Sequence, residues 1–335
     1  MLLLWHHLFL NAKNYTFSLF YFSGVPIESV IAQFCKCCVA IFMFLSGYGL
    51  FISYTSFTSK TEIKSPLKAD IVFIKNRVLK LMSNYWFVFI IFVPLGLFFG
   101  RKFYEVYGNN PLHYLANLFG LSYLFYKDEF TMNPTWWYVS EILLFYAIYP
   151  LMYRIYKKIN VFLLIITVGF CLIPGVFRGL NIYLCTLVLG TVFADRKLFE
   201  KYASALKNKV LAVIIPLVAF VPLCVVRYFL NAENMVYAMK FDTVFIVPIL
   251  FLSYILVSKI PYVSSVLEEL GRKSGFIFLF HTFLFGYYFK SFFYSFKYPI
   301  LIFAALLIIS YITAFIFEWL MKITKYKDIF KKITS

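Results

Sequence analysis

The stretch that decides the fold is NPTWWYVSEILLFYAIYP, residues 133–150. An Asn-Pro turn leads into a Trp pair and then into a long apolar run of helical length, in which Glu141 is the single carboxylate. Trp136, Trp137 and Tyr138 are amphipathic rings of the kind that settle at the headgroup level of a bilayer. Glu141 is then expected about 7 Å below them, at roughly 1.5 Å per helical residue. A carboxylate at that depth must face the protein interior, so Glu141 either locks two helices together or belongs to a site inside the membrane.

The composition places the chain in the membrane class. It has 335 residues, of which 62% are hydrophobic and only 14% are charged, whereas soluble domains average about 25% charged residues. Apolar runs of spanning length recur from end to end. The sequence therefore predicts an all-α, polytopic membrane protein with about ten transmembrane helices, organised as one membrane domain over residues 1–335. The opening run MLLLWHHLFL is too short to span, so the first helix is expected to be truncated.

The expected spans cover residues 1–10, 32–54, 83–100, 135–156, 160–177, 181–194, 210–230, 242–258, 271–289 and 299–321. A tight Arg178-Gly179 turn is expected between the fifth and the sixth. The long connection 101–135 is expected on the outer side, where its part from Pro111 to Tyr126 would lie along the membrane surface or dip into it.

Basic residues gather in alternate connections. The loops at 60–80, 154–158 and 196–209 and the C-terminal tail are rich in lysine and arginine, and all fall on one face of this arrangement. The positive-inside rule puts that face, and both termini, in the cytoplasm. The net charge of +17 then reflects membrane orientation, and no nucleic-acid partner is expected.

The cysteines do not form a recognisable site. All six fall in or beside apolar runs, which is typical of small membrane-helix residues rather than of a disulfide framework or a metal site. They are Cys35, Cys37, Cys38, Cys171, Cys185 and Cys224. No metal site and no tightly bound cofactor are predicted.

Three of the four histidines lie in apolar runs. They are His6, His7 and His281. A buried imidazole serves either as a helix-packing hydrogen bonder or as a general base. Adjacent histidines point about 100° apart on a helix, so His6 and His7 cannot both face one site squarely. In the predicted topology His7 and Glu141 lie at similar depth, which permits contact between them; that contact would orient the imidazole and stabilise its protonated form.

Two further sets of residues have both a structural and a functional interpretation. Arg77 and Lys80 are three apart, so they share a helix face where the third span enters from the cytoplasm. They serve either as positive-inside anchors or as a cation pair for the phosphates of a soluble donor. Ser46 lies among small residues in FMFLSGYGL, a pattern that favours close helix packing.

Short motifs distributed over nearly the whole chain resemble, in their order, those of the acyltransferase-3 family of integral membrane acyltransferases. They are WHHLF with His6 and His7; FMFLSGYGL with Ser46; Arg77-Val-Leu-Lys80 followed by Tyr85-Trp86; Trp137-Tyr-Val-Ser-Glu141 with Tyr146 and Pro150; LVLGTVFAD with Gly190; and Leu270-Gly271-Arg-Lys-Ser274 through His281. Each motif alone is weakly specific, and the resemblance depends on their combination.

This resemblance implies an enzyme that moves an acyl group, usually acetyl from cytoplasmic acetyl-CoA, onto a hydroxyl of a cell-surface or exported bacterial polysaccharide. His7 would be the catalytic histidine, with His6 beside it and Glu141 as a partner, while Arg77 and Lys80 would hold the donor. Ser46, Trp137, Ser274 and His281 would line the pocket. The acceptor would be a glycan or a lipid-linked saccharide, and the enzyme would be a multi-pass protein of the bacterial cell membrane. Direct transfer and an acyl-enzyme both stay open, as does a homo-oligomer.

The chain departs from the family pattern at three places. Lys80 stands where the family prefers arginine, which loses bidentate phosphate geometry, and Ser83 stands where it prefers proline. The family also pairs its first-helix histidine with a basic residue further upstream than Met1. The expectation is therefore that the true start lies upstream or that the chain is a fragment of impaired activity.

Two other classes of protein are alternatives. A polysaccharide flippase or polymerase is likewise polytopic and basic, but it needs neither the histidines nor Glu141. A transporter or structural subunit without chemistry would not bind acetyl-CoA.

Overall fold

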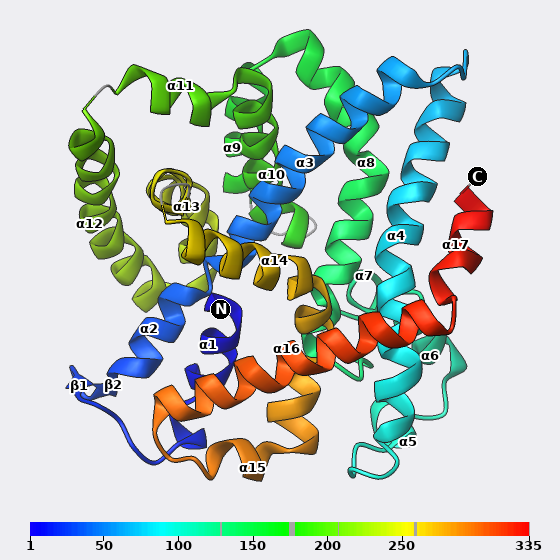
Figure 1. Ribbon diagram of the computed structural model, residues 1–335, viewed down its shortest axis with the longest axis vertical. Helices are drawn as coiled ribbons and strands as arrows, with labels where there is room; N and C mark the ends of the chain where they lie inside the picture. The colour runs from blue at the N-terminus through cyan, green and yellow to red at the C-terminus, as the bar shows by residue number, and fades with distance from the viewer. Residues whose placement is uncertain (128, 174–177, 207, 258–259, 335) are drawn as a thin grey trace. The chain divides into compact units, whose positions relative to one another are not determined.

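The computed structural model describes residues 1–127, 129–173, 178–206, 208–257 and 260–334. Within them nearly all regular structure is helical, which confirms the all-α prediction (Figure 1). The exception is a short antiparallel hairpin of β1 (Tyr21–Phe22) and β2 (Val25–Pro26), in which Tyr21 pairs with Pro26.

Every expected span corresponds to a helix. Among the described residues, five stretches are long and apolar enough to cross a membrane. They are α2 (Ile27–Cys35) taken together with α3 (Cys38–Lys60), α4 (Pro66–Leu95), α12 (Lys209–Glu233), α13 (Met235–Val257) and α16 (Pro299–Ile323). The other expected spans are shorter or more polar: α1 (Leu2–Phe9), α8 (Trp137–Ile159), α9 (Phe162–Leu172), α10 (Arg178–Arg196) and α14 (Pro261–Thr282). The protein is a polytopic helical membrane protein.

Several helix boundaries differ from those expected. α4 begins at Pro66, well before residue 83, because a proline fits the first helical turn and the leucine, lysine and arginine residues that follow are good helix formers. The predicted Arg178-Gly179 turn is wrong, since both residues open α10; residues 174–177 lie outside the described part. α14 begins at Pro261 and continues into a π-helical turn, η3 (Phe283–Tyr288).

Short helices fill the connections. The long connection between α4 and α8 holds α5 (Phe103–Tyr107), α6 (Pro111–Leu118), α7 (Ser122–Tyr126) and the 3₁₀ turn η2 (Pro134–Trp136). Elsewhere lie η1 (Ala12–Asn14), α11 (Leu198–Ala205), α15 (Lys290–Tyr294) and α17 (Tyr326–Thr334).

The chain forms two compact units. Unit 1 contains residues 1–32, 65–148 and 269–335, and unit 2 contains residues 33–64 and 149–268. The prediction of a single membrane domain stays a prediction.

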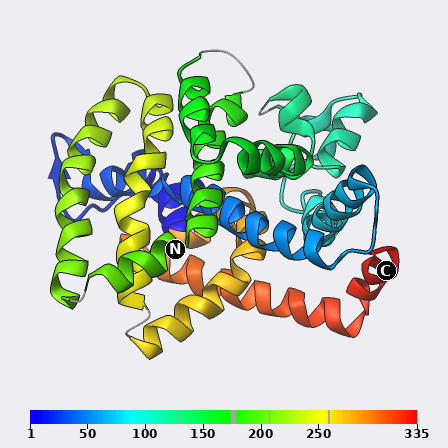
Figure 2. The same ribbon diagram turned by 90° about the horizontal axis from the view of Figure 1, so that it is seen from above.

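Unit 1 has a core of aromatic rings. Phe92 of α4 stacks on Phe280 of α14 at 5.6 Å between ring centroids, and both rings belong to one large buried cluster. Within this unit α16 runs across the direction of α4, as the two views together show (Figures 1 and 2), and α17 packs back on α4.

Unit 2 depends on a close helix pair. A Cβ atom at Gly47 of α3 would lie 1.9 Å from the Leu187 carbonyl oxygen of α10, and one at Gly190 would lie 2.1 Å from the Phe44 carbonyl oxygen. Only glycine allows two backbones to approach this closely.

The same unit contains a buried ion pair between α12 and α13. Arg227 and Asp242 are each 1% exposed, and Nε of the arginine donates to the carboxylate at 2.5 Å. A second guanidinium nitrogen donates to the Gln33 carbonyl oxygen at 3.0 Å. The charges are thus satisfied within the unit, as a buried pair requires.

Candidate active site

The two histidines of α1 have different surroundings. Nδ1 of His6 lies 2.7 Å from the Ala32 carbonyl oxygen, and the side chain is buried. A carbonyl can only accept, so Nδ1 of His6 carries a hydrogen and fastens α1 to α2. His7 is half-buried, and its ring centroid lies 4.9 Å from that of His6.

The ring of His7 lies against His281 of α14, with 5.2 Å between ring centroids. His281 is 0% exposed. Its Nδ1 lies 2.9 Å from the Ile277 carbonyl oxygen and 3.0 Å from that of Phe278, so this nitrogen also carries the hydrogen. The structure therefore brings together two imidazoles from opposite ends of the chain.

Glu141 lies in the second turn of α8 and is 2% exposed. Its Oε2 has no hydrogen-bond partner in the described part of the chain. An unpaired buried carboxylate oxygen is costly in a structural residue, and it is expected where a substrate or a moving proton completes the site. Direct contact between His7 and Glu141 stays a prediction.

The start of α8 is anchored on the turn of α14 that carries His281. The indole nitrogen of Trp136 donates to the Leu279 carbonyl oxygen at 2.8 Å, and the Asn133 amide donates to the same oxygen at 3.1 Å. The rings of Tyr138 and Phe278 lie 5.2 Å apart. These contacts connect the helix of Glu141 to the helix of His281.

The sequence predicts Trp136 at the headgroup level of the bilayer, and this prediction is wrong. Trp136 is buried, and it stacks on Phe89 at 5.7 Å between ring centroids. The reason is that the indole N–H donates to the Leu279 carbonyl oxygen inside the protein, so it does not require a hydrogen-bond acceptor in the headgroup region.

The predicted donor-binding pair lies inside α4 rather than at its start. Arg77 is half-buried over the Phe73 ring at 5.2 Å, and its charge interacts with the phenol of Tyr146 on α8. Lys80 is exposed. Tyr146 lies five residues after Glu141, about 7 Å further along α8.

Two of the residues predicted to line the pocket make local hydrogen bonds. Ser274 donates to the Gly271 carbonyl oxygen at 2.6 Å, within its own helix. Its neighbour Lys273, which the sequence reasoning missed, is the buried one: it pairs with Glu318 of α16 and lies 3.7 Å from Glu269. Ser46 belongs to unit 2 and donates to the Phe42 carbonyl oxygen at 2.8 Å, which agrees with a packing role.

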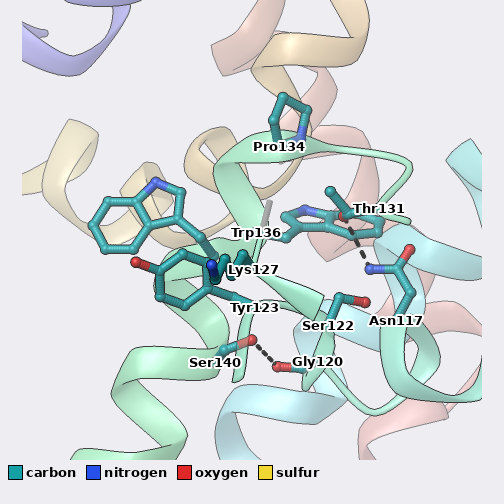
Figure 3. Close-up of a pocket in the computed structure, with 10 residues that line it drawn as sticks. Asn117, Gly120, Ser122, Tyr123, Lys127, Thr131, Pro134, Trp136 and Ser140 are labelled. Carbon is teal, nitrogen blue, oxygen red and sulfur yellow. Dashed lines mark hydrogen bonds between the residues drawn. The ribbon is translucent and has the colours of Figure 1, made fainter. Parts of the chain in front are cut away.

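Trp137 lines a small pocket at the start of α8 (Figure 3). Its wall is held by two hydrogen bonds: Ser140 donates to the Gly120 carbonyl oxygen at 2.5 Å, and the Asn117 amide donates to Thr131 Oγ1 at 3.1 Å. The complete lining is Asn117, Gly120, Ser122, Tyr123, Lys127, Thr131, Pro134, Trp136, Trp137 and Ser140. The sequence signal, a mixture of aromatic and hydroxyl residues in the 111–135 stretch, is too common to single out these positions.

A second, apolar cavity of about 400 Å³ lies between α4 and the helices α5 and α6. It is lined by Phe89, Ile90, Val93, Pro94, Leu97, Phe103, Tyr114 and Leu118. Ile90 and Leu97 are more than 60% exposed, so this is an open apolar hollow at the surface of the unit. Among the described residues, no group of three or more His, Cys, Asp or Glu side chains is placed to hold a metal ion.

Comparison with known proteins identifies the family of the chain. The acyltransferase-3 family, described as an acyltransferase domain, matches residues 1–319. No curated protein and no solved structure matches the chain. The family match includes every helix named in the site, from the histidines of α1 to His281 of α14. The chain therefore belongs to the acyltransferase-3 family, and it is a membrane acyltransferase.

Proposed function

We propose that this enzyme moves an acyl group, acetyl in the first instance, from cytoplasmic acyl-CoA to a hydroxyl of an exported or cell-surface polysaccharide. It would do so in the bacterial cell membrane, with both termini in the cytoplasm. The observation that carries the proposal is that the ring centroids of His7 and His281 lie 5.2 Å apart. His281 lies on the turn of α14 to which the start of α8, the helix of Glu141, is hydrogen-bonded. A proton-handling site inside an apolar bundle is what acyl transfer to a weakly acidic hydroxyl needs.

The donor would enter from the cytoplasmic side. Arg77 and Lys80 share a face of α4 and would hold the phosphates of CoA, with Arg77 the stronger contributor because its guanidinium can bond in a bidentate manner. The charge of Arg77 acts on Tyr146, and α8 would connect this position to Glu141. No resident cofactor is invoked, since acyl-CoA is a substrate.

In the transfer step His7 would take the proton of the acceptor hydroxyl. The hydroxyl oxygen then bonds to the thioester carbonyl carbon, the carbon–sulfur bond breaks, and CoA leaves as the thiol after receiving a proton. Glu141 would stabilise the imidazolium that His7 becomes. His281, whose Nδ1–H is held by two carbonyl oxygens, would keep the ring of His7 in place.

The first experiment is mass spectrometry of surface polysaccharide from cells that carry or lack the gene. Loss of O-acetyl groups without a change in polymer length or export is the expected result. His7→Ala should abolish acetylation, whereas Lys13→Ala, an exposed residue in the turn after α1, should not. Unchanged O-acetyl content after deletion would refute the proposal, and shortened or unexported polymer would favour a flippase or polymerase.

The second experiment isolates the donor site. Arg77→Ala in purified protein should weaken acetyl-CoA binding by tenfold or more, an effect of about 1.4 kcal/mol. The matched control is Lys75→Ala, an exposed charge on the same helix. Equal loss in both variants would show only a general effect of positive charge.

A further inference from the structure

The pocket of Figure 3 lies at the start of α8, the helix of Glu141, and its lining includes none of His7, Glu141 and His281. Trp137 lines it and lies on the same face of α8 as Glu141, because the two residues are four apart. Ser140, which also lines it, directly precedes Glu141. Trp137 and Ser140 are therefore about 6 Å and about 1.5 Å from Glu141 along the axis of α8.

One side of the pocket is aromatic. The rings of Tyr123 and Trp137 lie 5.9 Å apart between centroids, at 52° to one another. Both side chains are half-buried, and both line the pocket. Aromatic faces of this kind can pack on the apolar C–H faces of a sugar ring.

The other side is polar, and Figure 3 shows Ser122 and Asn117 there, across from the Tyr123 ring. Asn117 is committed to the wall: its Oδ1 accepts from the Tyr107 hydroxyl at 2.5 Å and from the Met132 N–H at 3.2 Å. Ser122 is not. Within the described residues its buried hydroxyl makes only one contact, a donation to the Phe130 carbonyl oxygen at 3.5 Å, the outer limit of a hydrogen bond. Its oxygen can therefore accept from a ligand, and its hydrogen can turn toward one.

The rim is held in place before any ligand arrives. Phe130 has a left-handed backbone with φ of 55°, and its ring stacks on His113 at 3.6 Å and 13°. Arg101 donates to the carbonyl oxygens of Met132 at 2.7 Å and of Thr131 at 3.0 Å. A preformed rim reduces the entropic cost of binding.

The size of the pocket limits what can enter. Its interior measures about 10 Å³, or about 230 Å³ with the open mouth included. An interior of this size takes one water-sized group. A sugar ring would therefore lie across the mouth with a single hydroxyl-bearing group inserted.

We propose that this pocket is the acceptor subsite and binds one sugar unit of a saccharide. Tyr123 and Trp137 contact the ring, and the Ser122 hydroxyl pairs with a sugar hydroxyl. This inference rests on the proposed function, because it names the acceptor of that reaction as a saccharide bound at the start of α8.

The test uses three positions on one short helix, α7. Ser122 and Tyr123 line the pocket, whereas Phe125 is 70% exposed and does not. The full-length protein is purified into lipid nanodiscs, with acetyl-CoA as donor. The acceptor probe is an oligosaccharide fraction from the cells' own surface polysaccharide, stripped of O-acetyl groups by mild alkali. KM is measured separately for acceptor and for donor.

Tyr123→Ala should raise the KM for the oligosaccharide at least tenfold and leave the KM for acetyl-CoA within twofold. Ser122→Ala should act in the same direction by about threefold to tenfold, and Phe125→Ala should change neither constant. A Tyr123→Ala protein with an unchanged acceptor KM overturns the subsite. So does an equal rise in both constants in a protein that still elutes as a folded peak.

A direct binding measurement separates this inference from the proposed function. Quenching of tryptophan fluorescence by the same oligosaccharides is followed in wild type and in Tyr123→Ala, without donor. If wild type transfers no acetyl group but still binds saccharide, and Tyr123→Ala does not, the subsite stands while the reaction is wrong. If both proteins bind equally, the subsite is wrong whatever the enzyme does.

Discussion

Glu141 is a buried carboxyl group whose hydrogen-bonding capacity is not fully used by the protein. Its Oε2 is buried and lacks a hydrogen-bond partner in the described chain, although each buried ionised oxygen without a partner costs several kcal/mol. By contrast, Asp242 is equally buried and fully paired with Arg227. This difference is the reason to test Glu141, rather than Asp242, for a part in the proposed reaction.

We expect Glu141→Gln to lower acetyl transfer by roughly 10²–10⁴-fold, the range of a lost proton-transfer partner. The amide keeps the volume and removes the charge, so the midpoint of thermal unfolding should stay the same or rise. The matched control is Glu129→Gln, an exposed carboxylate in the connection between α4 and α8. A purely structural Glu141 would give the opposite pattern, with activity kept and the midpoint lowered.

At the scale of single elements, the packing of α3 on α10 depends on two glycines. A methyl group at Gly47 meets the backbone oxygen of Leu187, which cannot turn aside as a side chain would. We expect Gly47→Ala to cost roughly 1–3 kcal/mol of stability through overpacking.

The same helix contains its own control for this substitution. A Cβ at Gly49 has nothing within 4 Å, so Gly49→Ala should be neutral or stabilise α3 by up to about 1 kcal/mol, the helix-propensity difference. Fluorescence-detected size exclusion after heating measures both variants. Equal behaviour of the two would contradict the close contact between α3 and α10.

The pairing of α12 with α13 gives a second prediction at this scale. Arg227→Met leaves Asp242 buried without its partner, and we expect a loss of about 3–5 kcal/mol. The double variant Arg227→Met with Asp242→Leu removes both charges and should recover most of that loss. The same heating assay reports both, and a double variant no better than the single one would argue against a buried ion pair.

At the scale of the whole molecule, the distribution of charge predicts the orientation in the membrane. Cysteines introduced at Lys68 and Lys201, both exposed, should react with an impermeant maleimide only after cells are permeabilised. A cysteine at Tyr104, 65% exposed in α5, should react in intact cells. The native cysteines are free, and all but Cys224 are buried, so the parent chain provides the background. Labelling of Lys201→Cys in intact cells would show that the orientation is the opposite of the predicted one.

How much could be predicted from the sequence depends on how local each feature is. The expected spans could be assigned because a membrane helix needs a continuous apolar run and makes its hydrogen bonds within itself. Helix starts were less certain: α4 begins at Pro66 because polar residues continue a helix as readily as apolar ones. The candidate residues His7, Glu141, Arg77 and Trp137 could also be selected from the sequence, because each family motif is a short continuous stretch of one or two helical turns.

The sequence by itself therefore determined the membrane class, the helical composition, the order of the spans and the family. Only the tertiary structure decided that His7 lies against His281, that Trp136 turns inward to the Leu279 carbonyl, and that Lys273 rather than Ser274 is buried. It also decided that Ser122 and Tyr123 line a pocket beside the helix of Glu141. These contacts join residues far apart in the chain, or select one face of a helix over another, and local periodicity does not contain the packing that makes that choice.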